Sequence, residues 1–534
     1  MTGPDGPVRI HGHCRLDDAA IRAAMREGRA ERLVDAGGSF VIAAGDVVVS
    51  SRSVAVAYHH GPATHGPGIA DVAATLPFAW NHRAVADFLV FAHPLGDHTF
   101  HPGVQRLRPG TVSTMRGDRD GGGLDSRPAP EPVPADPDAA SAVLALVDAV
   151  RGDAGSECGL SMSGGLDSRV LLAALLRLGH RPTLFVSGVP GSFDRVVASA
   201  IARRYGLPIV VTKVEGQTLL DGSRDGDAAG IGSLPLTNRA GLEHLRVAAS
   251  GFGSPILLGM GGEYARSYYA ARRGLSALRQ AALPGRRATE LITREFPVPL
   301  TSRELRMVHP ALREALNPEA IRARVDSALR AQVSSVLRAR VDSVLRARVG
   351  SVLRASSGSA LDRADEFFLN QYALHKVSAE LASVDGHVRW RAPFLDPGWV
   401  QAVRALPRRW KLGSRLHRYC VARLWPSLLE FPEAGTSGGT LARRPPSAYW
   451  LTGTRYPSGP HYLDQRMFRS GPLVDLVREH RARLEDLVEP ELIDALAAEQ
   501  TAQGRRPHLT FGLLALSLYR ERVQQLARDH RAVS

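Results

Sequence analysis

The hydrophobic pattern changes its period near residue 139, and this change divides the chain into two parts. Before it, apolar residues come in short runs separated by turn residues. The stretch 38–50 predicts a β-hairpin, because two apolar runs flank Gly45 and Asp46. Further short strands and turns are predicted over 101–112. Residues 1–116 are therefore expected to form a domain of short strands.

After residue 139, helical and strand patterns alternate. The expected elements are, in order, helix 140–151, strand 157–162, helix 168–179, strand 182–187, helix 193–205, strand 208–214, helix 239–249 and strand 255–258. This alternation is typical of a doubly wound parallel sheet. Such sheets bind ligands at the carboxyl ends of their strands. Residues 139–534 are thus predicted to form an α/β domain with a ligand site at that edge.

Two segments interrupt this pattern. Residues 117–138 are rich in Gly, Asp and Pro, which predicts a linker. Residues 324–355 repeat an octad four times, as RVDSALRA, QVSSVLRA, RVDSVLRA and RVGSVLRA. Their apolar positions fit a helix whose stripe advances by about 80° per repeat. We expect a surface insertion, helical or partly disordered and without chemistry; the alternative is a basic helix that binds a partner.

Length and composition narrow the class of protein. A chain of 534 residues is expected to hold two or more domains. It has no apolar run of 18 residues and no signal-peptide pattern at its start, which predicts a cytoplasmic protein without membrane contact. The three cysteines, Cys14, Cys158 and Cys420, lack the spacing of a zinc site or a disulfide framework.

The chain carries a net charge of +14, almost entirely from arginine. A basic chain can bind nucleic acid. Here the arginines are spread along the sequence with few aromatic residues between them. This pattern disfavours a nucleic-acid partner and favours a cationic surface that suits ATP or an acidic peptide.

The most informative segment is the loop SGGLDS, from Ser163 to Ser168. It follows an expected strand and opens an expected helix, which is the arrangement of an anion site. The two glycines allow backbone amides to approach phosphate oxygens, and the serine hydroxyls add donors. Asp167 would repel phosphate unless it holds Mg²⁺. The plainer alternative is a glycine-rich turn with a capping Asp or Ser.

Two later segments carry further candidate chemistry. The turn LLGMGGE over 257–263 follows a strand and could bring Glu263 beside Asp167, so that both carboxylates bridge Mg²⁺. The alternative is a helix start at which Glu263 favours the dipole. The segment RAPFLD over 391–396 contains Arg391, which could pair with a phosphate or with Asp396. Taken alone, this segment would be a structural turn.

Together these segments resemble the asparagine synthetase superfamily over nearly the full chain. Its members share, in this order, an SGGLDS loop, a G-x-G-x-[DE] turn and an R-x-P-F-L-D segment. The resemblance implies an N-terminal glutaminase-like domain of the Ntn type (αββα) over 1–116. It implies a C-terminal ATP pyrophosphatase domain, HUP-like with added helices, over 139–534.

The resemblance also implies the ligands and their residues. ATP would be split between its α and β phosphates with the help of Mg²⁺. The implied catalytic residues are Asp167, Glu263 and Arg391, with Asp167 and Glu263 as metal ligands. The implied ATP-binding residues are Ser161, Ser163, Gly164, Gly165, Leu166, Asp167, Ser168, Val186, Asp194, Gly259 and Gly261.

One departure from the superfamily narrows the activity. Glutamine-dependent members have a nucleophilic cysteine directly after the initiator Met, whereas this chain has Thr2. Cys14 lies too far inside the chain to have a free amine. The N-terminal domain is therefore expected to lack glutaminase activity. Members without that cysteine include β-lactam synthetases, carbapenam synthetases and lasso peptide cyclases.

The segment 392–408 is most similar to the lasso peptide cyclases. Such an enzyme adenylates an Asp or Glu side chain of a core peptide, and the N-terminal amine of the peptide then closes a macrolactam. A precursor peptide is the implied substrate, with a leader protease and a leader-binding protein as possible partners. The alternative is an asparagine synthetase-like or β-lactam synthetase-like enzyme that acts on a small molecule with ammonia or an internal amine.

A second departure disfavours the β-lactam synthetases. These enzymes have a lysine in a P-K-x-G segment that stabilises the second step, and an ungapped comparison puts Glu433 at that position. Lys411, Arg443 or Arg444 could supply the missing positive charge.

Overall fold

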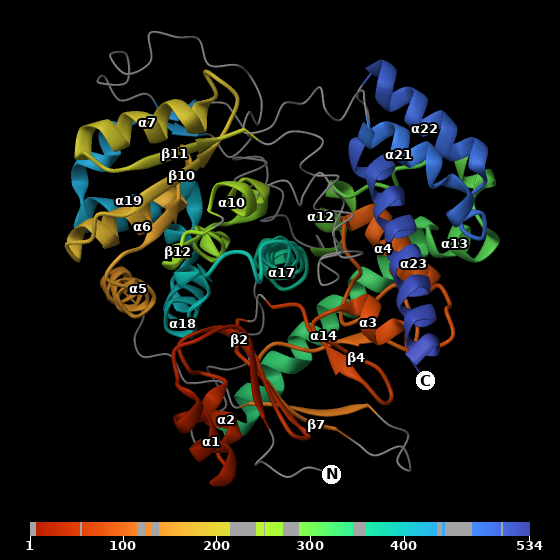
Figure 1. The fold of residues 1–534 in the computed structure, drawn as a ribbon, viewed down its shortest axis with the longest axis horizontal. Helices are drawn as coiled ribbons and strands as arrows, with labels where there is room; N and C mark the ends of the chain where they lie inside the picture. The colour runs from red at the N-terminus through yellow and green to blue at the C-terminus, as the bar shows by residue number, and fades with distance from the viewer. Residues whose placement is uncertain are drawn as a thin grey trace.

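The computed structural model describes residues 7–53, 56–115, 123–129, 138–213, 242–249, 251–270, 288–344, 359–434, 441–443, 472–503 and 506–533. Three groups of elements are visible in Figure 1: a parallel sheet with its helices at the upper left, an antiparallel sheet at the bottom, and helices at the right. The predicted α/β class is confirmed.

The N-terminal part contains an antiparallel sheet of five strands in the order β1-β2-β3-β7-β8. These strands are β1 (Val8–Cys14), β2 (Gly38–Ala44), β3 (Val47–Ser50), β7 (Thr111–Met115) and β8 (Leu124–Pro128). The predicted hairpin is confirmed as β2 and β3, with Ala44 opposite Val47. Gly45 turns the chain with a φ of 56°, a value that favours glycine.

The strand β8 lies inside the predicted linker, which corrects that prediction for residues 124–128. It pairs with β7 along its whole length, with Pro128 opposite Thr111. A proline cannot donate a hydrogen bond, but β8 is the edge strand, where this is tolerated. The composition of the segment therefore concealed a strand that belongs to the N-terminal sheet.

Smaller elements complete the N-terminal part. A three-stranded sheet has the order β5-β4-β6, formed by β5 (His65–Gly66), β4 (His59–His60) and β6 (Gln105–Arg106). Four helices accompany the sheets, namely α1 (Asp18–Arg26), α2 (Ala30–Leu33), α3 (Ile69–Ala73) and α4 (His82–Phe91). Figure 1 shows α4 beside α13 (Pro310–Ala315) and α23 (Pro507–Val533), which it contacts. The two parts of the chain thus share an interface.

The second sheet is parallel and has the order β11-β10-β9-β12-β13. Its strands are β9 (Gly159–Ser161), β10 (Thr183–Ser187), β11 (Ile209–Thr212), β12 (Ile256–Leu257) and β13 (Trp390–Arg391). The predicted helices appear as α5 (Ala139–Asp153), α6 (Leu166–Arg177), α7 (Phe193–Tyr205) and α10 (Glu243–Ala248). The strand order reverses beside β9, which is where open α/β sheets bind ligands.

Further helices come after β12, some of them before β13 and some after it. They are α12 (Ala288–Glu295), α14 (Pro318–Val344), α16 (Ala360–Phe367), the π-helix η4 (Phe368–Ala373), α17 (Leu374–Ala382), α18 (Pro397–Ala405), α19 (Arg415–Leu424), α21 (Pro472–Glu479) and α22 (Pro490–Gln503). In Figure 1, α17 lies at the centre between the parallel sheet and the C-terminal helices.

The first octad of the repeat is not a surface insertion, which corrects that prediction. It lies in α14, and both Val325 and Leu329 are buried in the core. Arg324 donates to Asp87 of α4 at 2.8 Å. Two apolar positions four residues apart share one helical face, which explains why this octad can pack inward. The predictions for 345–355 lie outside the described residues.

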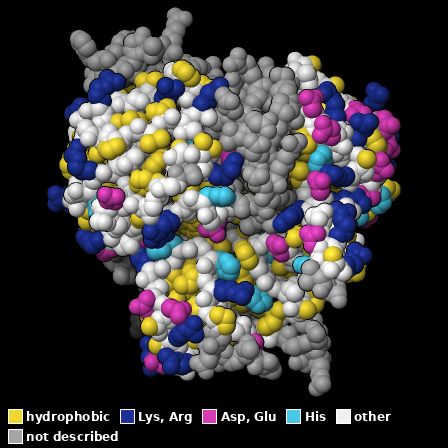
Figure 2. Space-filling model, viewed as in Figure 1, with side chains coloured by type: hydrophobic (Ala, Val, Ile, Leu, Met, Phe, Trp, Pro, Cys, Tyr) yellow, Lys and Arg dark blue, Asp and Glu magenta, His cyan; other side chains and the backbone are white. Residues whose placement is uncertain are grey.

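One hydrophobic core joins the two parts of the chain, since Phe88 of α4 and Val170 of α6 belong to the same cluster. A second, smaller core lies between α1, α2 and the N-terminal sheet, around Ile21 and Phe40. Lys and Arg side chains are scattered over the visible face and mixed with Asp and Glu (Figure 2). Among the helices that the structure describes, none is long and apolar enough to cross a membrane.

Candidate active site

The loop after β9 is held by its own side chains. The Ser163 amide donates to Oγ of Ser168 at 3.1 Å, and the Gly165 amide donates to Oγ of Ser163 at 3.1 Å. The Gly164 amide donates to Oδ1 of Asp194 at 2.6 Å. The predicted inward amides therefore have side-chain acceptors in this structure. An incoming phosphate would replace these acceptors. One of them, the carboxylate of Asp194, is itself an anion, so the loop already binds a negative charge at Gly164.

Close packing explains why the loop needs glycine. A Cβ atom on Gly164 would lie 2.2 Å from the ring of Phe193, the first residue of α7. Two of the implied ATP-binding residues, Leu166 and Val186, have side chains in the core. Their side chains are therefore placed to support the loop from beneath. Ser161, the last residue of β9, is half-buried at the start of the loop.

The glycine turn after β12 lies directly against Asp167, as expected from the parallel pairing of β12 with β9. A Cβ atom on Gly262 would lie 2.4 Å from Oδ1 of Asp167, and one on Gly259 would lie 3.1 Å from its Cβ. Gly261 has a φ of 87°, and a Cβ there would lie 2.6 Å from Leu395. The structure thus brings together all three segments that the sequence singled out.

Two side chains that the sequence did not single out contact Asp167. Nη2 of Arg266 donates to Oδ1 of Asp167 at 2.7 Å, and Nε2 of His417 lies 2.7 Å from the same oxygen. Burial opposes ionisation of Asp167, but the charge of Arg266 and the contact with His417 outweigh it and lower its pKa to about 2. Burial lowers the pKa of His417, so its ring is neutral at pH 7. Asp167 is therefore a carboxylate balanced mainly by Arg266.

Glu263 is half-buried, and its Oε2 accepts a hydrogen bond from the Gly261 amide at 3.1 Å. Its negative charge acts on His417 and on a buried pair in α17. In that pair, Nζ of Lys376 lies 2.8 Å from Oε1 of Glu380. Glu263 and Asp167 therefore both act on His417, so both carboxylates contribute to the charge of the site.

Within the described residues, Arg391 makes no hydrogen bond or ion pair with either carboxylate. Its Nη1 donates to the backbone oxygen of Trp390 at 2.8 Å, and the charges that act on it are those of Asp153, Arg389 and Arg15. Its catalytic role stays a prediction. Its suggested partner Asp396 instead caps α18 through the Gly398 amide at 2.9 Å.

Asp396 also lies 3.0 Å from Nη1 of Arg15 in the N-terminal part. A second link joins Oγ of Ser53 to the backbone oxygen of Leu395. The RAPFLD segment thus connects the glycine turn to the N-terminal sheet.

Glu433, which the ungapped comparison puts at the lysine position of β-lactam synthetases, is paired with Arg418. Nη2 of Arg418 lies 2.6 Å from Oε2 of Glu433, and its Nε donates to both carboxylate oxygens at 3.1 Å. Lys411, which the sequence offered as a substitute for the missing lysine, is not paired with Glu433. It interacts with Glu366 instead. The side chain of Arg443 and the whole of Arg444 lie outside the described residues.

A second arginine connects this region to the loop. Arg169 of α6 is fully buried and donates to the backbone oxygens of Gly164 at 2.8 Å and Phe431 at 3.0 Å, and also to that of Pro432. Burial lowers the pKa of Arg169 to about 10, which leaves it charged at pH 7. Its sequence position, directly after Ser168, is the only signal that could have pointed to this role.

The donor set fits a magnesium ion that is held partly by phosphate. Asp167 is ionised and 24% exposed, and its Oδ2 has no hydrogen-bond partner in the described part of the chain. No group of three or more His, Cys, Asp or Glu residues suited to a metal occurs among the described residues. Magnesium bound with nucleotides commonly uses one or two carboxylates together with phosphate oxygens and water. Asp167 and Glu263 are sufficient for this mode.

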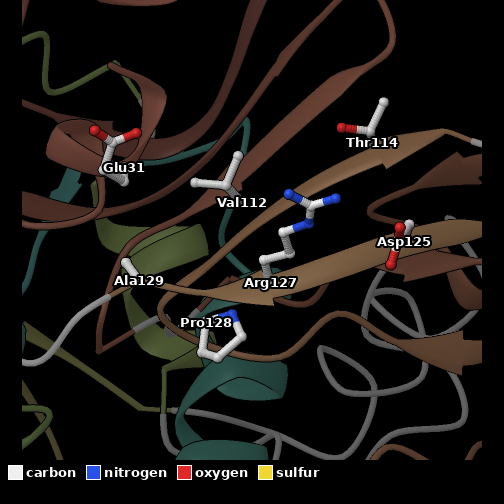
Figure 3. Close-up of a pocket in the computed structure, with 7 residues that line it drawn as sticks. All are labelled: Glu31, Val112, Thr114, Asp125, Arg127, Pro128 and Ala129. Atoms are coloured by element: carbon white, nitrogen blue, oxygen red, sulfur yellow. The ribbon is translucent and has the colours of Figure 1, made fainter. Parts of the chain in front are cut away.

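A hollow of about 500 Å³ lies elsewhere, on the N-terminal sheet (Figure 3). It is lined by Glu31, Val112, Thr114, Asp125, Arg127, Pro128 and Ala129. None of these residues belongs to the loop, the glycine turn or the RAPFLD segment, so the hollow is distinct from the candidate site.

A phosphate loop at the carboxyl end of a parallel sheet, with a carboxylate, an arginine and a neutral histidine beside it, defines a nucleotide-using enzyme of the α/β class. Residues 144–519 match the family described as asparagine synthase. This match covers more than half of the chain, and the protein belongs to that family. It is accordingly an ATP-dependent enzyme that joins carbon to nitrogen. No curated protein matches the chain.

Proposed function

We propose that the protein is a lasso peptide macrolactam cyclase. It would adenylate an Asp or Glu side chain of a core peptide and join it to the N-terminal amine of the same peptide. The observation that carries the adenylation step is the contact of the glycine turn with an ionised Asp167 at the start of α6. The identity of the substrate rests on the sequence resemblance of 392–408 to these cyclases.

In the first step, a carboxylate oxygen of the peptide attacks the α-phosphorus of ATP. The bond from that phosphorus to the bridging oxygen breaks, and pyrophosphate leaves with the electron pair. The chain must offset the repulsion between two anions, and it does so with the loop amides and nearby cations. Magnesium, held by Asp167 and Glu263, would neutralise phosphate charge when bound.

In the second step, the amine nitrogen attacks the acyl carbon, the bond to AMP breaks, and the amine loses its proton. The product is lighter than the peptide by one water. Holding both ends of one peptide replaces a bimolecular encounter, with effective molarities that can reach roughly 10⁵–10⁸ M. A threaded peptide is suited to this gain because both reacting groups belong to the same molecule.

The N-terminal part would serve as a support, in an Ntn-type arrangement that has lost its glutaminase function. Cys14 ends β1, and burial raises the pKa of its thiol, which disfavours a reactive thiolate. Thr2 lies outside the described residues. Arg106 of β6 donates to Nδ1 of His375 at 2.7 Å and to Oγ of Ser378 at 2.9 Å, which fastens α17 beside the site.

The HUP-like character of the C-terminal domain is part of the same proposal, as are a precursor peptide, a leader protease and a leader-binding protein as partners. The pairing of Glu433 with Arg418 supports a second step that differs from that of the β-lactam synthetases. The lysine expected at this position is absent. Arg418 is the only described side chain paired with Glu433, and the negative charge of Glu433 already neutralises it.

The test is pyrophosphate release from ATP and Mg²⁺ with one candidate substrate at a time. The substrates are the cognate leader-cleaved precursor peptide, aspartate with ammonia, and aspartate with glutamine. Release with the peptide, and a product lighter by one water in mass spectrometry, would support the cyclase. Release only with aspartate would assign a small-molecule amide synthetase. Dependence on glutamine would overturn the inactive N-terminal domain.

A further inference from the structure

Arg266 is incompletely satisfied although it lies in the candidate site. Its Nη2 donates to Asp167, but its Nε is buried and has no hydrogen-bond partner. A buried N–H group without a partner destabilises the protein, because it has lost its hydrogen bonds to water. The side chain is 25% exposed, and Nη1 makes no hydrogen bond within the described residues, so the guanidinium also has a donor that solvent can reach. This combination is expected of a group that receives a ligand.

The other described cations near the loop are engaged elsewhere. Arg169 is fully buried and donates to three backbone oxygens. Arg418 is paired with both oxygens of Glu433. Lys376 is paired with a buried glutamate one turn further along α17. Among the described residues, Arg266 is therefore the cation beside Asp167 that best combines exposure with an unused donor.

The position of Arg266 matches the charge that the first step creates. It follows the glycine turn and contacts Asp167 at the start of α6, beside the loop that would hold the phosphates. A guanidinium has five donors in a fixed fork and binds phosphate oxygens in pairs. The carboxylate of Asp167 must also be balanced by a positive charge when no nucleotide and no magnesium are bound. Arg266 can meet both needs in turn.

Resting on the proposed function, we propose that Arg266 is a pyrophosphate-binding residue that exchanges partners. In the free enzyme it neutralises Asp167. When magnesium and ATP bind, Asp167 turns to the metal, and Arg266 donates to oxygens of the departing pyrophosphate. As the bond between the α-phosphorus and the bridging oxygen breaks, the guanidinium stabilises the new negative charge. It stays protonated throughout and transfers no proton.

The experiment measures equilibrium binding of magnesium pyrophosphate to the full-length protein by titration calorimetry. Arg266→Gln is expected to weaken binding about 10- to 100-fold, as for lost hydrogen bonds to a charged group. Arg266→Lys keeps the positive charge but loses the planar fork of donors. Its pyrophosphate affinity is expected to lie between those of wild type and Arg266→Gln. Arg22→Gln is the matched control, because Arg22 pairs with Asp18 on an exposed helix face. Melting curves establish whether each variant is folded.

A second pair of variants separates a direct role from an indirect one. In an Asp167→Asn background without magnesium, Arg266→Gln should still weaken pyrophosphate binding. If the loss disappears there, Arg266 acts only through Asp167 and the proposal is wrong. Equal affinity of wild type and Arg266→Gln also overturns it. If Arg266→Gln does not fold, the comparison uses Arg266→Lys, and equal pyrophosphate affinity of wild type and Arg266→Lys overturns the proposal.

The proposed function can fail separately. If the wild-type protein binds neither magnesium ATP nor magnesium pyrophosphate, the adenylating site itself is contradicted, and Arg266 with it. If the wild type binds both and the Arg266 variants bind equally well, only the assignment of Arg266 is lost.

Discussion

The same three residue types occur together twice in this molecule, with different consequences. Asp167 in the candidate site is contacted by Arg266 and His417. At the interface between the two parts, Asp153 of α5 is contacted by Arg15 at 2.9 Å and by His13 at 3.1 Å. Both groups set one carboxylate against one guanidinium and one imidazole. Their surroundings decide what each of them does.

The interface group is closed. The Asp153 side chain is 1% exposed, against 24% for Asp167. Arg15 also donates to the backbone oxygen of Ala149 at 3.0 Å and pairs with Asp396. The site group is open, because Nε of Arg266 has no hydrogen-bond partner. Residue types alone therefore do not distinguish a structural ion pair from a functional one, whereas exposure and unused donors do.

The largest effect is expected from Asp167→Asn. Removing this charge should lower the rate of pyrophosphate release by about 10²–10³-fold, as for the loss of one electrostatic stabiliser in an active site. The variant should still fold, with a modestly lower melting temperature, because the ion pair with Arg266 is lost while Gly262 still packs against the side chain. Stopped assays with ATP and the substrate measure the rate. A variant with wild-type turnover would exclude Asp167 from the metal site.

Asp153→Ala should have the opposite profile. Removing a buried partner leaves Arg15 facing the interface with one carboxylate fewer, and we expect a loss of about 3 kcal/mol in the free energy of unfolding. Urea denaturation measures this loss. Below the melting temperature, the variant should still bind magnesium ATP. Loss of nucleotide binding in a folded variant would show that the interface group also shapes the site.

His13→Gln is expected to have a smaller effect. The contact of His13 with Asp153 contributes one hydrogen bond, worth about 1 kcal/mol of unfolding free energy. Glutamine can keep part of this bond, so the loss should stay below that of Asp153→Ala. The same urea experiment resolves the difference. A loss as large as that of the aspartate variant would mean that the histidine, rather than the guanidinium, holds the carboxylate.

The smallest effect is expected from pH. The pKa of Asp167 is lowered to about 2, so its stabilising contribution is complete above the ordinary carboxyl range and is lost as pH falls through 2. The difference in unfolding free energy between wild type and Asp167→Asn should therefore be constant from pH 7 to pH 5 and should shrink from pH 5 to pH 3. Urea titrations at these three values measure it. A difference that stays unchanged down to pH 3 would show that the pKa of this carboxyl is not lowered in the folded protein.

Local sequence patterns anticipated a large part of the fold. The hairpin at Gly45 and the helix 193–205 follow from turn residues and apolar period, and both are observed. The edge strand β8 was missed because its few residues lie among Gly, Asp and Pro. The packing of Val325 was missed because a repeat of identical octads gives no sign of which copy meets the core.

By itself, the sequence determined four of the five strands of the parallel sheet and the three segments that the structure brings together. These are local properties, because an apolar run specifies a strand, and a glycine-rich turn after it specifies a helix start. The tertiary structure alone decided which charges surround the carboxylate. Arg266 and His417 lie 99 and 250 residues beyond Asp167, and Arg391 donates to a backbone oxygen instead. Charges act through space, and folding sets that distance.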